Sequence, residues 1–294
     1  MTSSSYIKFT IGIPVFNGQK TLGETLESCK NLPCEMVNII ISDNNSTDET
    51  YEIAKTYTNK YSNFNLYKHE TNLGPTHNFN FLLKNCKTEF FMWLAADDII
   101  SETLDFSEIE RLMNQYPDAI GVSPYALVED LGRCVVDSGN QTLVGPRLIN
   151  ILRYLLKPGV NSRFYSIYRT ERLRALHGSI FEPNEPDYFG SDIVFSVGVL
   201  HEGVWPMATN FILNRKAGIS ADGWKIRKIF SKNLLSALIP SAKFVKKIVG
   251  MCSTVDKIPV LLVASMLYIR YLIGPAKHKL RTFIHKIFTI KFKH

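Results

Sequence analysis

The alternation of apolar and helical runs over the first hundred residues most constrains the fold of this chain. Short runs rich in Val, Ile and Phe predict four β-strands, at residues 9–15, 37–42, 65–69 and 90–95. Helical patterns lie between them, at residues 21–29, 46–61 and 75–86. Strands this apolar, separated by helices, are typical of a parallel sheet that is covered on both faces.

Polar residues follow three of these strands at their carboxyl ends. They are Asn17 after the first strand, Asp43 and Asn44 after the second, and Asp97 and Asp98 after the fourth. Ligands of open α/β sheets bind at the carboxyl ends of the strands, so we expect a site there. Ser46 and Glu49 have the spacing of a capping box, which predicts that the second helix begins near residue 46.

Residues 119–224 have a less regular pattern. It predicts strands and helices joined by a loop rich in Pro and acidic residues: strands at 119–123, 164–168 and 208–214, helices at 147–157 and 192–201, and the loop at 182–187. The five cysteines are scattered and form no CxxC pair, which favours reduced thiols in a cytosol over a zinc site or disulfides.

The net charge of +7 hides a strong asymmetry. Residues 225–294 hold 15 lysines and arginines against one acidic residue, whereas residues 1–224 carry a net charge of −7. The basic residues flank apolar stripes, a pattern typical of helices that lie on an anionic membrane. No nucleic-acid motif accompanies them, so we expect no nucleic-acid partner. The stripes would equally suit packing on the rest of the chain or on a second copy of it, as a homo-oligomer. A helix over residues 258–274 would be about 26 Å long, short of the roughly 30 Å bilayer core.

The segment from residue 10 to residue 100 resembles family 2 glycosyltransferases. Four motifs carry the resemblance: IPVFN at 13–17, SDNNSTD at 42–48, NLGP at 72–75 and WLAADD at 93–98. The resemblance implies an α/β protein of the GT-A fold, with a Rossmann-like, mostly parallel central sheet flanked by helices and a C-terminal amphipathic helical extension. The domains implied are a catalytic domain at 1–224 and a basic helical segment at 225–294. Within the first, residues 1–100 would bind the nucleotide sugar and residues 101–224 the acceptor.

The resemblance also assigns roles to individual residues. Those implied to bind the nucleotide sugar are Pro14, Phe16, Asn17, Asp43, Asn44, Gly74, Asn78 and Asp97. Asp98 would hold Mn²⁺ or Mg²⁺. Many relatives have aspartates at positions 44 and 95, where this chain has Asn44 and Ala95. Because an amide both donates and accepts, Asn44 leaves a uridine and a thymidine donor open. For Gly74 and Asn78, a turn followed by a helix explains the residues equally well.

The catalytic base implied by the resemblance is an aspartate that opens a helix after the acceptor loop. Asp192 matches this position, with Asp187 and Glu185 as reserves in the same loop. Asp192 would serve equally well as a helix cap favoured by the helix dipole. Arg215 and Lys216, at the end of a predicted strand, would lie near the diphosphate in such a site.

The implied function is an inverting, metal-dependent transfer of one sugar from a UDP- or dTDP-sugar to a glycan acceptor. The acceptor would be linked to polyprenyl diphosphate, in bacterial O-antigen or capsule synthesis, with the protein peripheral on the cytoplasmic face of the cell membrane. The same chemistry on a protein or soluble acceptor is an alternative. A non-catalytic scaffold that binds nucleotide sugars is another, since Ala95 removes one carboxylate.

Overall fold

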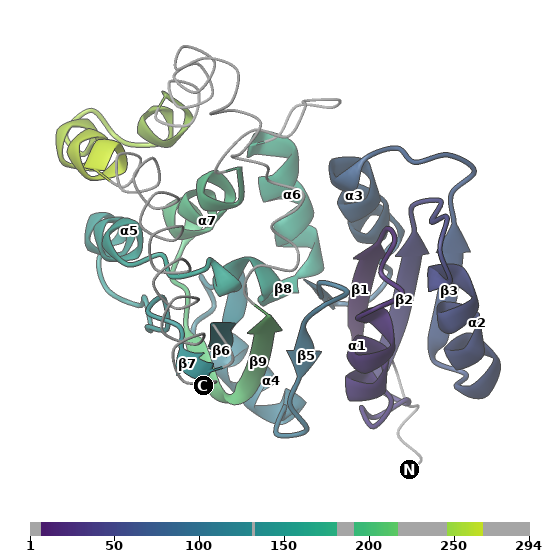
Figure 1. Cartoon of the computed structure of the whole chain (residues 1–294). Helices are drawn as coiled ribbons and strands as arrows, with labels where there is room; N and C mark the ends of the chain where they lie inside the picture. Colours follow the sequence, from purple (N-terminus) through teal and green to yellow (C-terminus); the bar gives the residue numbers. More distant parts are fainter. Residues whose placement is uncertain (1–6, 131–132, 181–190, 217–245, 267–294) are drawn as a thin grey trace, which may run out of the picture.

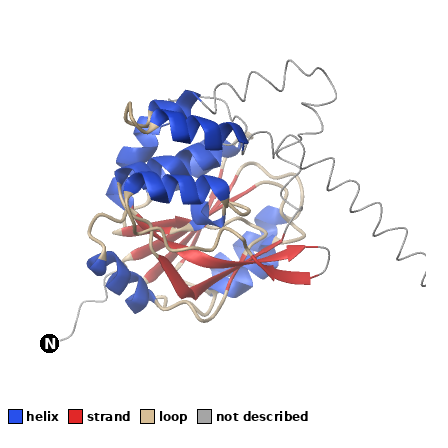
Figure 2. Ribbon diagram, turned by 90° about the vertical axis from the view of Figure 1, so that its left-hand side faces the viewer, coloured by secondary structure: helices blue, strands red, loops and turns tan. Residues whose placement is uncertain are grey.

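The computed structural model describes residues 7–130, 133–180, 191–216 and 246–266, and a central sheet lies between layers of helices (Figures 1 and 2). The strands are β1 (Phe9–Val15), β2 (Val37–Asp43), β3 (Phe64–Lys68), β4 (Phe90–Trp93), β5 (Ile99–Ile100), β6 (Gly121–Asp130), β7 (Arg133–Val136), β8 (Ile167–Arg169) and β9 (Met207–Lys216). The helices are α1 (Leu22–Cys29), α2 (Thr50–Lys60), α3 (Pro75–Asn85), α4 (Phe106–Gln115), α5 (Arg147–Leu156), α6 (Thr170–Ile180) and α7 (Ser191–Glu202), with a 3₁₀ turn, η1 (Ser162–Tyr165).

The strand order is β3-β2-β1-β4-β8-β6-β9-β5, with β7 paired to β6. The strands β1 to β4 pair in parallel, as predicted. Beyond β4 the pairing is mixed, because β8 runs antiparallel to both β4 and β6, while β6 and β9 are parallel. In register, Val15 at the end of β1 pairs with Asp43 at the end of β2. The sheet thus brings the polar residues after these two strands to one edge.

Alternating side chains of the strands belong to two different hydrophobic clusters. Ile11 and Ile13 of β1 join α1, α2 and α4 in one cluster, whereas Phe91 and Trp93 of β4 join α3, α5, α6 and α7 in the other. Gly12 of β1 faces the second cluster, where a Cβ would lie 3.0 Å from the Phe91 ring and 3.1 Å from Leu82 Cβ. The missing side chain lets α3 approach the sheet closely.

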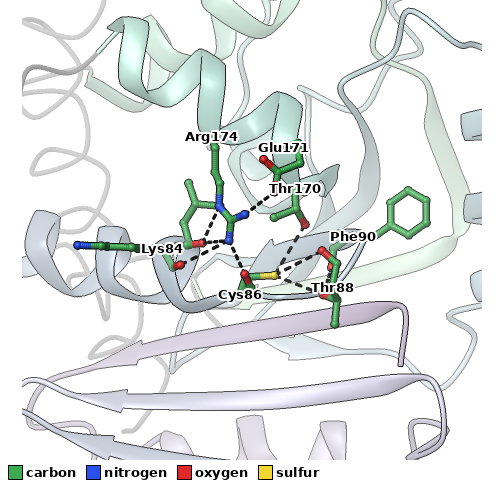
Figure 3. A network of polar contacts seen from close by, with 8 residues as sticks. Lys84, Cys86, Thr88, Phe90, Thr170, Glu171 and Arg174 are labelled. Carbon is green, nitrogen blue, oxygen red and sulfur yellow. Dashed lines mark hydrogen bonds and ion pairs between the residues drawn. The ribbon is translucent and has the colours of Figure 1, made fainter. Parts of the chain in front are cut away.

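A polar network joins α3 to α6 across the two halves of the chain (Figure 3). The Arg174 guanidinium of α6 donates from Nη2 to the Leu83 carbonyl at 3.0 Å and to the Cys86 carbonyl. These carbonyls end α3 and have no partner within the helix, so Arg174 acts as a C-terminal cap. Glu171 pairs with Arg174 but is 83 % exposed.

The structure confirms the predicted α/β class and differs in several elements. Residues 164–168, predicted as a strand, divide between η1 and β8. The helix predicted from residue 46 begins at Thr50, because Ser46 bonds to Asp43 instead of capping the helix. The prediction also omitted α4, α6, β5 and β7. For α4 the signal was present, since Asp105 caps it by accepting from the Ser107 N–H at 2.9 Å.

Residues 246–266 pack on the second hydrophobic cluster. They form helical segments at 246–250 and 257–266, and Ile248, Cys252, Val260 and Ala264 are buried in the cluster that contains α5 and α7. The other side of the second segment is exposed, with Ile258 at 70 %, Leu262 at 61 % and Met266 at 63 %. Among the described residues, no helix has the length and apolar character needed to cross a bilayer. The remaining parts of the predicted helical extension, at 225–245 and 267–294, lie outside the described residues.

Candidate active site

Asp43 anchors the first group of predicted site residues, at the carboxyl end of β2. It is fully buried, and its Oδ1 accepts from the Ser46 N–H at 3.0 Å and from the Ser46 hydroxyl at 2.5 Å. Its Oδ2 is buried and has no hydrogen-bond partner within the part of the chain that the structure describes. A buried carboxylate oxygen without a donor is costly, so this atom indicates where a ligand N–H would bind.

Asn44 is held by the loop before α3. Its Nδ2 donates to Asn72 Oδ1 and to the Gly74 carbonyl, both at 3.0 Å, and its Oδ1 accepts from the Leu73 N–H at 3.0 Å. Gly74 adopts a positive φ of 84°, which suits glycine, and precedes Pro75 at the start of α3. The Asn44 amide therefore fixes the loop, and this use accounts for its donors without a nucleotide.

Asn17 and Asn78 also bind the backbone of this edge. Asn17 has a φ of 52°, and its Oδ1 accepts from the Thr47 N–H at 2.9 Å, while its own N–H donates to Ser46 Oγ at 2.9 Å. Asn78 of α3 is buried and donates from Nδ2 to the Ser42 carbonyl at 2.9 Å. Its Oδ1 is a second buried polar atom for which the described residues supply no partner.

The loop after β1 lies beside the loop that carries Asp97. A Cβ at Gly18 would lie 2.6 Å from Val15 Cγ2 and 3.9 Å from Ala96 Cβ, so only glycine allows this close turn. Pro14 is buried within β1, whereas Phe16 is 47 % exposed. We call the group formed by residues 14–18, 42–48 and 72–78 the strand-end cluster.

Asp98 is buried beneath the partly exposed Asp97. It is 1 % exposed, and its Oδ2 accepts from Arg215 Nε of β9 at 3.0 Å. Burial raises the pKa of Asp98 to about 6; the Arg215 guanidinium opposes this shift, and the charge of Asp97 adds to it. The arginine therefore compensates only part of the cost of burying the Asp98 carboxylate next to a second carboxylate.

A third buried carboxylate, Asp137, holds the loop at 158–162. Its Oδ1 accepts from the Gly139 N–H at 3.0 Å and the Val160 N–H at 3.2 Å, and its Oδ2 accepts from Ser162 Oγ at 3.0 Å. Gly159 has a φ of 63°, and a Cβ there would lie 2.0 Å from Asp137 Oδ1. The loop thus wraps closely around one carboxylate.

The same loop contacts both Arg215 and Asp192. Arg215 Nη1 donates to the Val160 carbonyl at 2.8 Å, and Asn161 Nδ2 donates to Asp192 Oδ2 at 3.0 Å. Asp192 lies in the first turn of α7. A path of contacts therefore runs from Asp98 to Asp192. Hydrogen bonds join Asp98 to Arg215, Arg215 to Val160, and Asn161 to Asp192, and the loop backbone joins Val160 to Asn161. We call Asp137, the loop 158–162, Asp192 and Arg215 the loop network.

The Tyr165 side chain is affected by the charges of Asp97, Asp98 and Asp192. Its ring lies 4.6 Å from the Arg215 guanidinium. Burial raises the pKa of the Tyr165 phenol; the charge of Arg215 opposes this, while those of Asp98, Asp97 and Asp192 add to it. Three predicted site carboxylates thus act on one side chain, although they come from distant parts of the sequence. The reserve candidates Asp187 and Glu185 lie outside the described residues.

The acidic pair fits a hard divalent cation. Asp97 and Asp98 supply carboxylate oxygens, and the raised pKa of Asp98 indicates that the site is short of positive charge. The described residues contain no group of three or more His, Cys, Asp or Glu arranged to hold a metal. Mg²⁺ in phosphate-transfer sites is commonly held by one or two carboxylates, with phosphate and water completing its shell. Such an ion would therefore need the diphosphate of a ligand to complete its coordination here.

Residues 10–176, more than half of the chain, match the family model described as Glycosyl transferase family 2. This chain belongs to glycosyl transferase family 2. The matched segment contains the strand-end cluster, the acidic pair, Asp137 and the loop 158–162, whereas Asp192 and Arg215 lie beyond it.

Individual relatives in this family are similar over shorter segments. An uncharacterized glycosyltransferase of Rickettsia felis is 31 % identical over 130 residues, which are 42 % of this chain and 20 % of that protein. Poly(ribitol-phosphate) beta-N-acetylglucosaminyltransferase TarS of Staphylococcus aureus is 34 % identical over 102 residues, 33 % of this chain and 18 % of TarS. Each alignment thus spans a fifth or less of these relatives.

Solved structures are similar over nearly the whole chain. The crystal structure of S. aureus TarS 1–349 has a TM-score of 0.60 at 18 % identity and covers 91 % of this chain and 92 % of that one. The same TarS segment in complex with UDP-GlcNAc has a TM-score of 0.61 at 17 % identity, with the same coverage. The likeness confirms the GT-A fold predicted for this member of family 2.

The site of this family 2 chain contains residues that the sequence did not single out. Asp137, Asn161 and Tyr165 belong to no motif, and they lie in segments without helical or strand periodicity or, for Tyr165, in a misassigned strand. The only local signal was Pro158-Gly159, which indicates a turn but not what the turn contacts. Arg215 was predicted to lie near the diphosphate because of its charge, and in the structure its guanidinium forms an ion pair with Asp98.

Proposed function

We propose that this protein transfers a sugar from a nucleotide-diphospho-sugar to a hydroxyl of a bacterial cell-surface glycan, with inversion at the anomeric carbon. The observation that carries the proposal is the path of contacts that joins the acidic pair at 97–98 to Asp192. This path connects residues suited to a diphosphate with a carboxylate suited to an acceptor. Family membership supports the reaction class, and the names of the relatives support a glycan acceptor.

The donor base would bind at the strand-end cluster, and we propose uridine. Asp43 Oδ2 lacks a donor among the described residues, and the imide N–H that uracil shares with thymine would supply one. The alternative of thymidine drew on the amide at position 44, but the loop at 72–74 already uses that amide. The solved complexes of TarS with UDP and UDP-GlcNAc agree with a uridine donor in a related fold.

Asp98, with Asp97 beside it, would hold Mn²⁺ or Mg²⁺ together with the donor diphosphate. The ion would neutralise charge that develops on the leaving diphosphate. Arg215 would keep the Asp98 carboxylate ionised and in place, since it donates to Oδ2 at 3.0 Å and is itself fixed by the Val160 carbonyl. Asp97, being partly exposed, would contact the ribose or the sugar.

Asp192 would act as the general base. As the acceptor oxygen bonds to the anomeric carbon, its proton passes to the Asp192 carboxylate. The bond between that carbon and the phosphate oxygen breaks, and its electron pair leaves with the nucleoside diphosphate. Attack from the face opposite the leaving group inverts the configuration.

The test is the release of UDP from UDP-sugars with added Mn²⁺, after a panel of UDP- and dTDP-sugars has been screened for protection against thermal unfolding. We expect a UDP-sugar to protect, and Asp192→Asn to keep that protection while kcat falls about 10³-fold, within the range for loss of a general base. Ordinary turnover by Asp192→Asn would show that another group is the base. Protection without UDP release by the unsubstituted protein would favour the scaffold alternative.

The acceptor and its location form the finer part of the proposal. Relatives named for poly(ribitol-phosphate) and minor teichoic acid biosynthesis favour a bacterial surface polymer as the acceptor, the class to which the predicted O-antigen and capsule also belong. The acceptor would be linked to polyprenyl diphosphate and would be reached at the membrane. Ile258, Leu262 and Met266 would face the lipid, since they form an exposed apolar stripe in the basic segment 225–294.

The membrane proposal is tested by sedimentation with vesicles. The full chain should pellet with phosphatidylglycerol vesicles and not with phosphatidylcholine vesicles, and binding should weaken with salt. Substitution of Ile258, Leu262 and Met266 by serine should release the protein while the activity on a soluble donor is retained. Unchanged sedimentation of the triple variant would remove the stripe from the membrane interface.

A further inference from the structure

Asn161 is the buried side chain that touches the proposed base. It is 4 % exposed, and its Nδ2 donates to Asp192 Oδ2 at 3.0 Å. We propose that Asn161 is a positioning residue, which holds the Asp192 carboxylate so that Oδ1 faces the attacking hydroxyl. This inference depends on the proposed role of Asp192, and the experiments below separate the two.

The contacts around Asn161 fix the direction of its amide. Its Oδ1 accepts from the Tyr154 hydroxyl of α5 at 2.7 Å and lies 3.1 Å from Ser196 Oγ of α7. Ser196 Oγ is also 2.9 Å from the Asp192 carbonyl, so it lies one helical turn from the base. A flipped amide would turn its oxygen toward the carboxylate of Asp192. The observed orientation is therefore the one that presents a donor to an ionised base.

The backbone of Asn161 is as constrained as its side chain. It has a φ of 54°, a conformation that asparagine tolerates better than most residues. The residues on both sides, Val160 and Ser162, are bound to Asp137. The amide is thus held by α5, by α7 and by a buried carboxylate, so its position does not depend on ligand binding.

This arrangement suits a base that must stay aligned. A carboxylate in the first turn of a helix can rotate about its terminal bond, and both oxygens are then equivalent. A donor fixed on Oδ2 ends this equivalence and leaves Oδ1 for the substrate. Misplacement of a reacting group by about 1 Å can cost 10²-fold in rate, which sets the size of the expected effect.

The chain offers a matched control in Asn150. This residue is also buried and donates from Nδ2 to two carbonyls, Leu143 at 3.2 Å and Gly145 at 2.7 Å, while its Oδ1 accepts from the Gly145 N–H at 3.1 Å. It lies on α5, as does Tyr154, and the hydrogen bonds of its side chain to described residues all go to Leu143 and Gly145 rather than to Asp192. Loss of either asparagine should lower the melting temperature, but only the loss of Asn161 should affect the base.

The experiment compares kcat and the donor KM for UDP release from whichever of UDP-GlcNAc and UDP-glucose protects the protein. For Asn161→Ala we expect kcat to fall about 30- to 100-fold with the donor KM changed less than twofold, and for Asn150→Ala we expect both to stay within twofold of the unsubstituted protein. Asn161→Asp has the same shape and no amide donor, so it should lose at least as much activity. Tyr154→Phe, which loosens the amide without removing it, should lose about three- to tenfold.

A double variant separates positioning from general loss of structure. In the Asp192→Asn background, Asn161→Ala should lower the residual kcat less than threefold, because the group it positions is gone. Equal loss of kcat by Asn161→Ala with and without Asp192, or equal loss by Asn150→Ala, would overturn the inference. If Asn161→Ala does not fold, Asn161→Asp and Tyr154→Phe carry the same test, and full activity in both would overturn it. Ordinary turnover by Asp192→Asn would instead reject the proposed base.

Discussion

The strand-end cluster and the loop network are built in different ways. In the strand-end cluster, the register of the sheet positions most of the residues, since Val15 pairs with Asp43 and the neighbouring side chains form hydrogen bonds across adjacent strand ends. In the loop network, one irregular loop is placed by a buried carboxylate, and an arginine reaches it from 55 residues away in the sequence. The first arrangement repeats a general rule of α/β sheets. The second depends on particular side chains, so single substitutions should damage it more.

The largest effect is expected at Arg215, which joins Asp98 of the acidic pair to the Val160 carbonyl of the loop network. Arg215→Met leaves the Asp98 carboxylate buried without its cation, and we expect the free energy of unfolding to fall by about 3–5 kcal/mol. Urea denaturation at pH 7.5 measures the change. The double variant Asp98→Asn/Arg215→Met removes the charge as well and should recover more than half of the loss. If the double variant is as unstable as Arg215→Met, the unpaired charge of Asp98 does not account for the loss in the free energy of unfolding.

Asp137 and Asp48 allow a direct comparison of the two regions. Each carboxylate accepts hydrogen bonds from three donor groups, but Asp137 is 5 % exposed and binds the loop, whereas Asp48 is partly exposed and binds Thr50 and the Gln19 N–H. We expect Asp137→Ala to cost about 3 kcal/mol and Asp48→Ala about 1 kcal/mol, since water can replace only the second carboxylate. Urea denaturation of both variants checks this. Equal losses in the free energy of unfolding would contradict the expectation that substitutions damage the loop network more than the strand-end cluster.

Asp137→Ala should also affect function differently from Asp48→Ala. Because the loop carries Asn161, the first variant should lower kcat for UDP release while the protection by UDP-sugar is retained. Asp48 belongs to the strand-end cluster, where we propose that the donor base binds, so the second variant should weaken protection instead. The opposite pattern would contradict the division of roles between the two regions.

The sequence predicted the strand-end cluster more completely than the loop network, for a physical reason. Periodicity locates strand ends to within one or two residues, and parallel pairing then places Asn17, Asp43 and Asp98 on one edge. Nothing comparable places Asp137 or Asn161, because the loop at 158–162 follows no period and its partners are distant in the sequence. Even in the cluster the use of each residue was less predictable. Asn44, expected at the base, holds a loop, and Ser46, expected to cap a helix, binds Asp43.

Partly buried His177, in the second half of the chain, should make the stability of the protein decrease at acidic pH. Burial lowers the pKa of His177, on α6 near Trp93, to about 4 from an ordinary value of 6.5. Between these values the unfolded chain binds a proton that the folded chain excludes, so stability falls as the pH decreases. From pH 8 to pH 5 the loss from this group is about 2 kcal/mol.

Denaturation of His177→Gln at both pH values tests the assignment. The variant should lose about 2 kcal/mol less than the unsubstituted protein over this interval, whatever its stability at pH 8. The comparison with the unsubstituted protein matters because Asp98, whose pKa is raised, acts in the opposite direction in the same range. His201→Gln, at the partly exposed end of α7, is the control for the loss of a histidine. A variant with the same pH dependence as the unsubstituted protein would exclude His177 as the source.

The smallest effect is expected at the network that joins α3 to α6 (Figure 3). Arg174→Met removes the cap on the last carbonyls of α3, and we expect it to cost about 1–1.5 kcal/mol, the usual value of such hydrogen bonds. Glu171→Gln removes only an exposed ion pair and should change stability by less than about 0.5 kcal/mol. If the two halves were held together mainly by their hydrophobic clusters, both variants would be equally mild. A cost for Arg174→Met well above that for Glu171→Gln would show that the helix cap, rather than the surface charge, contributes to joining α3, beside the proposed donor site, to the second half of the chain, which carries the proposed base.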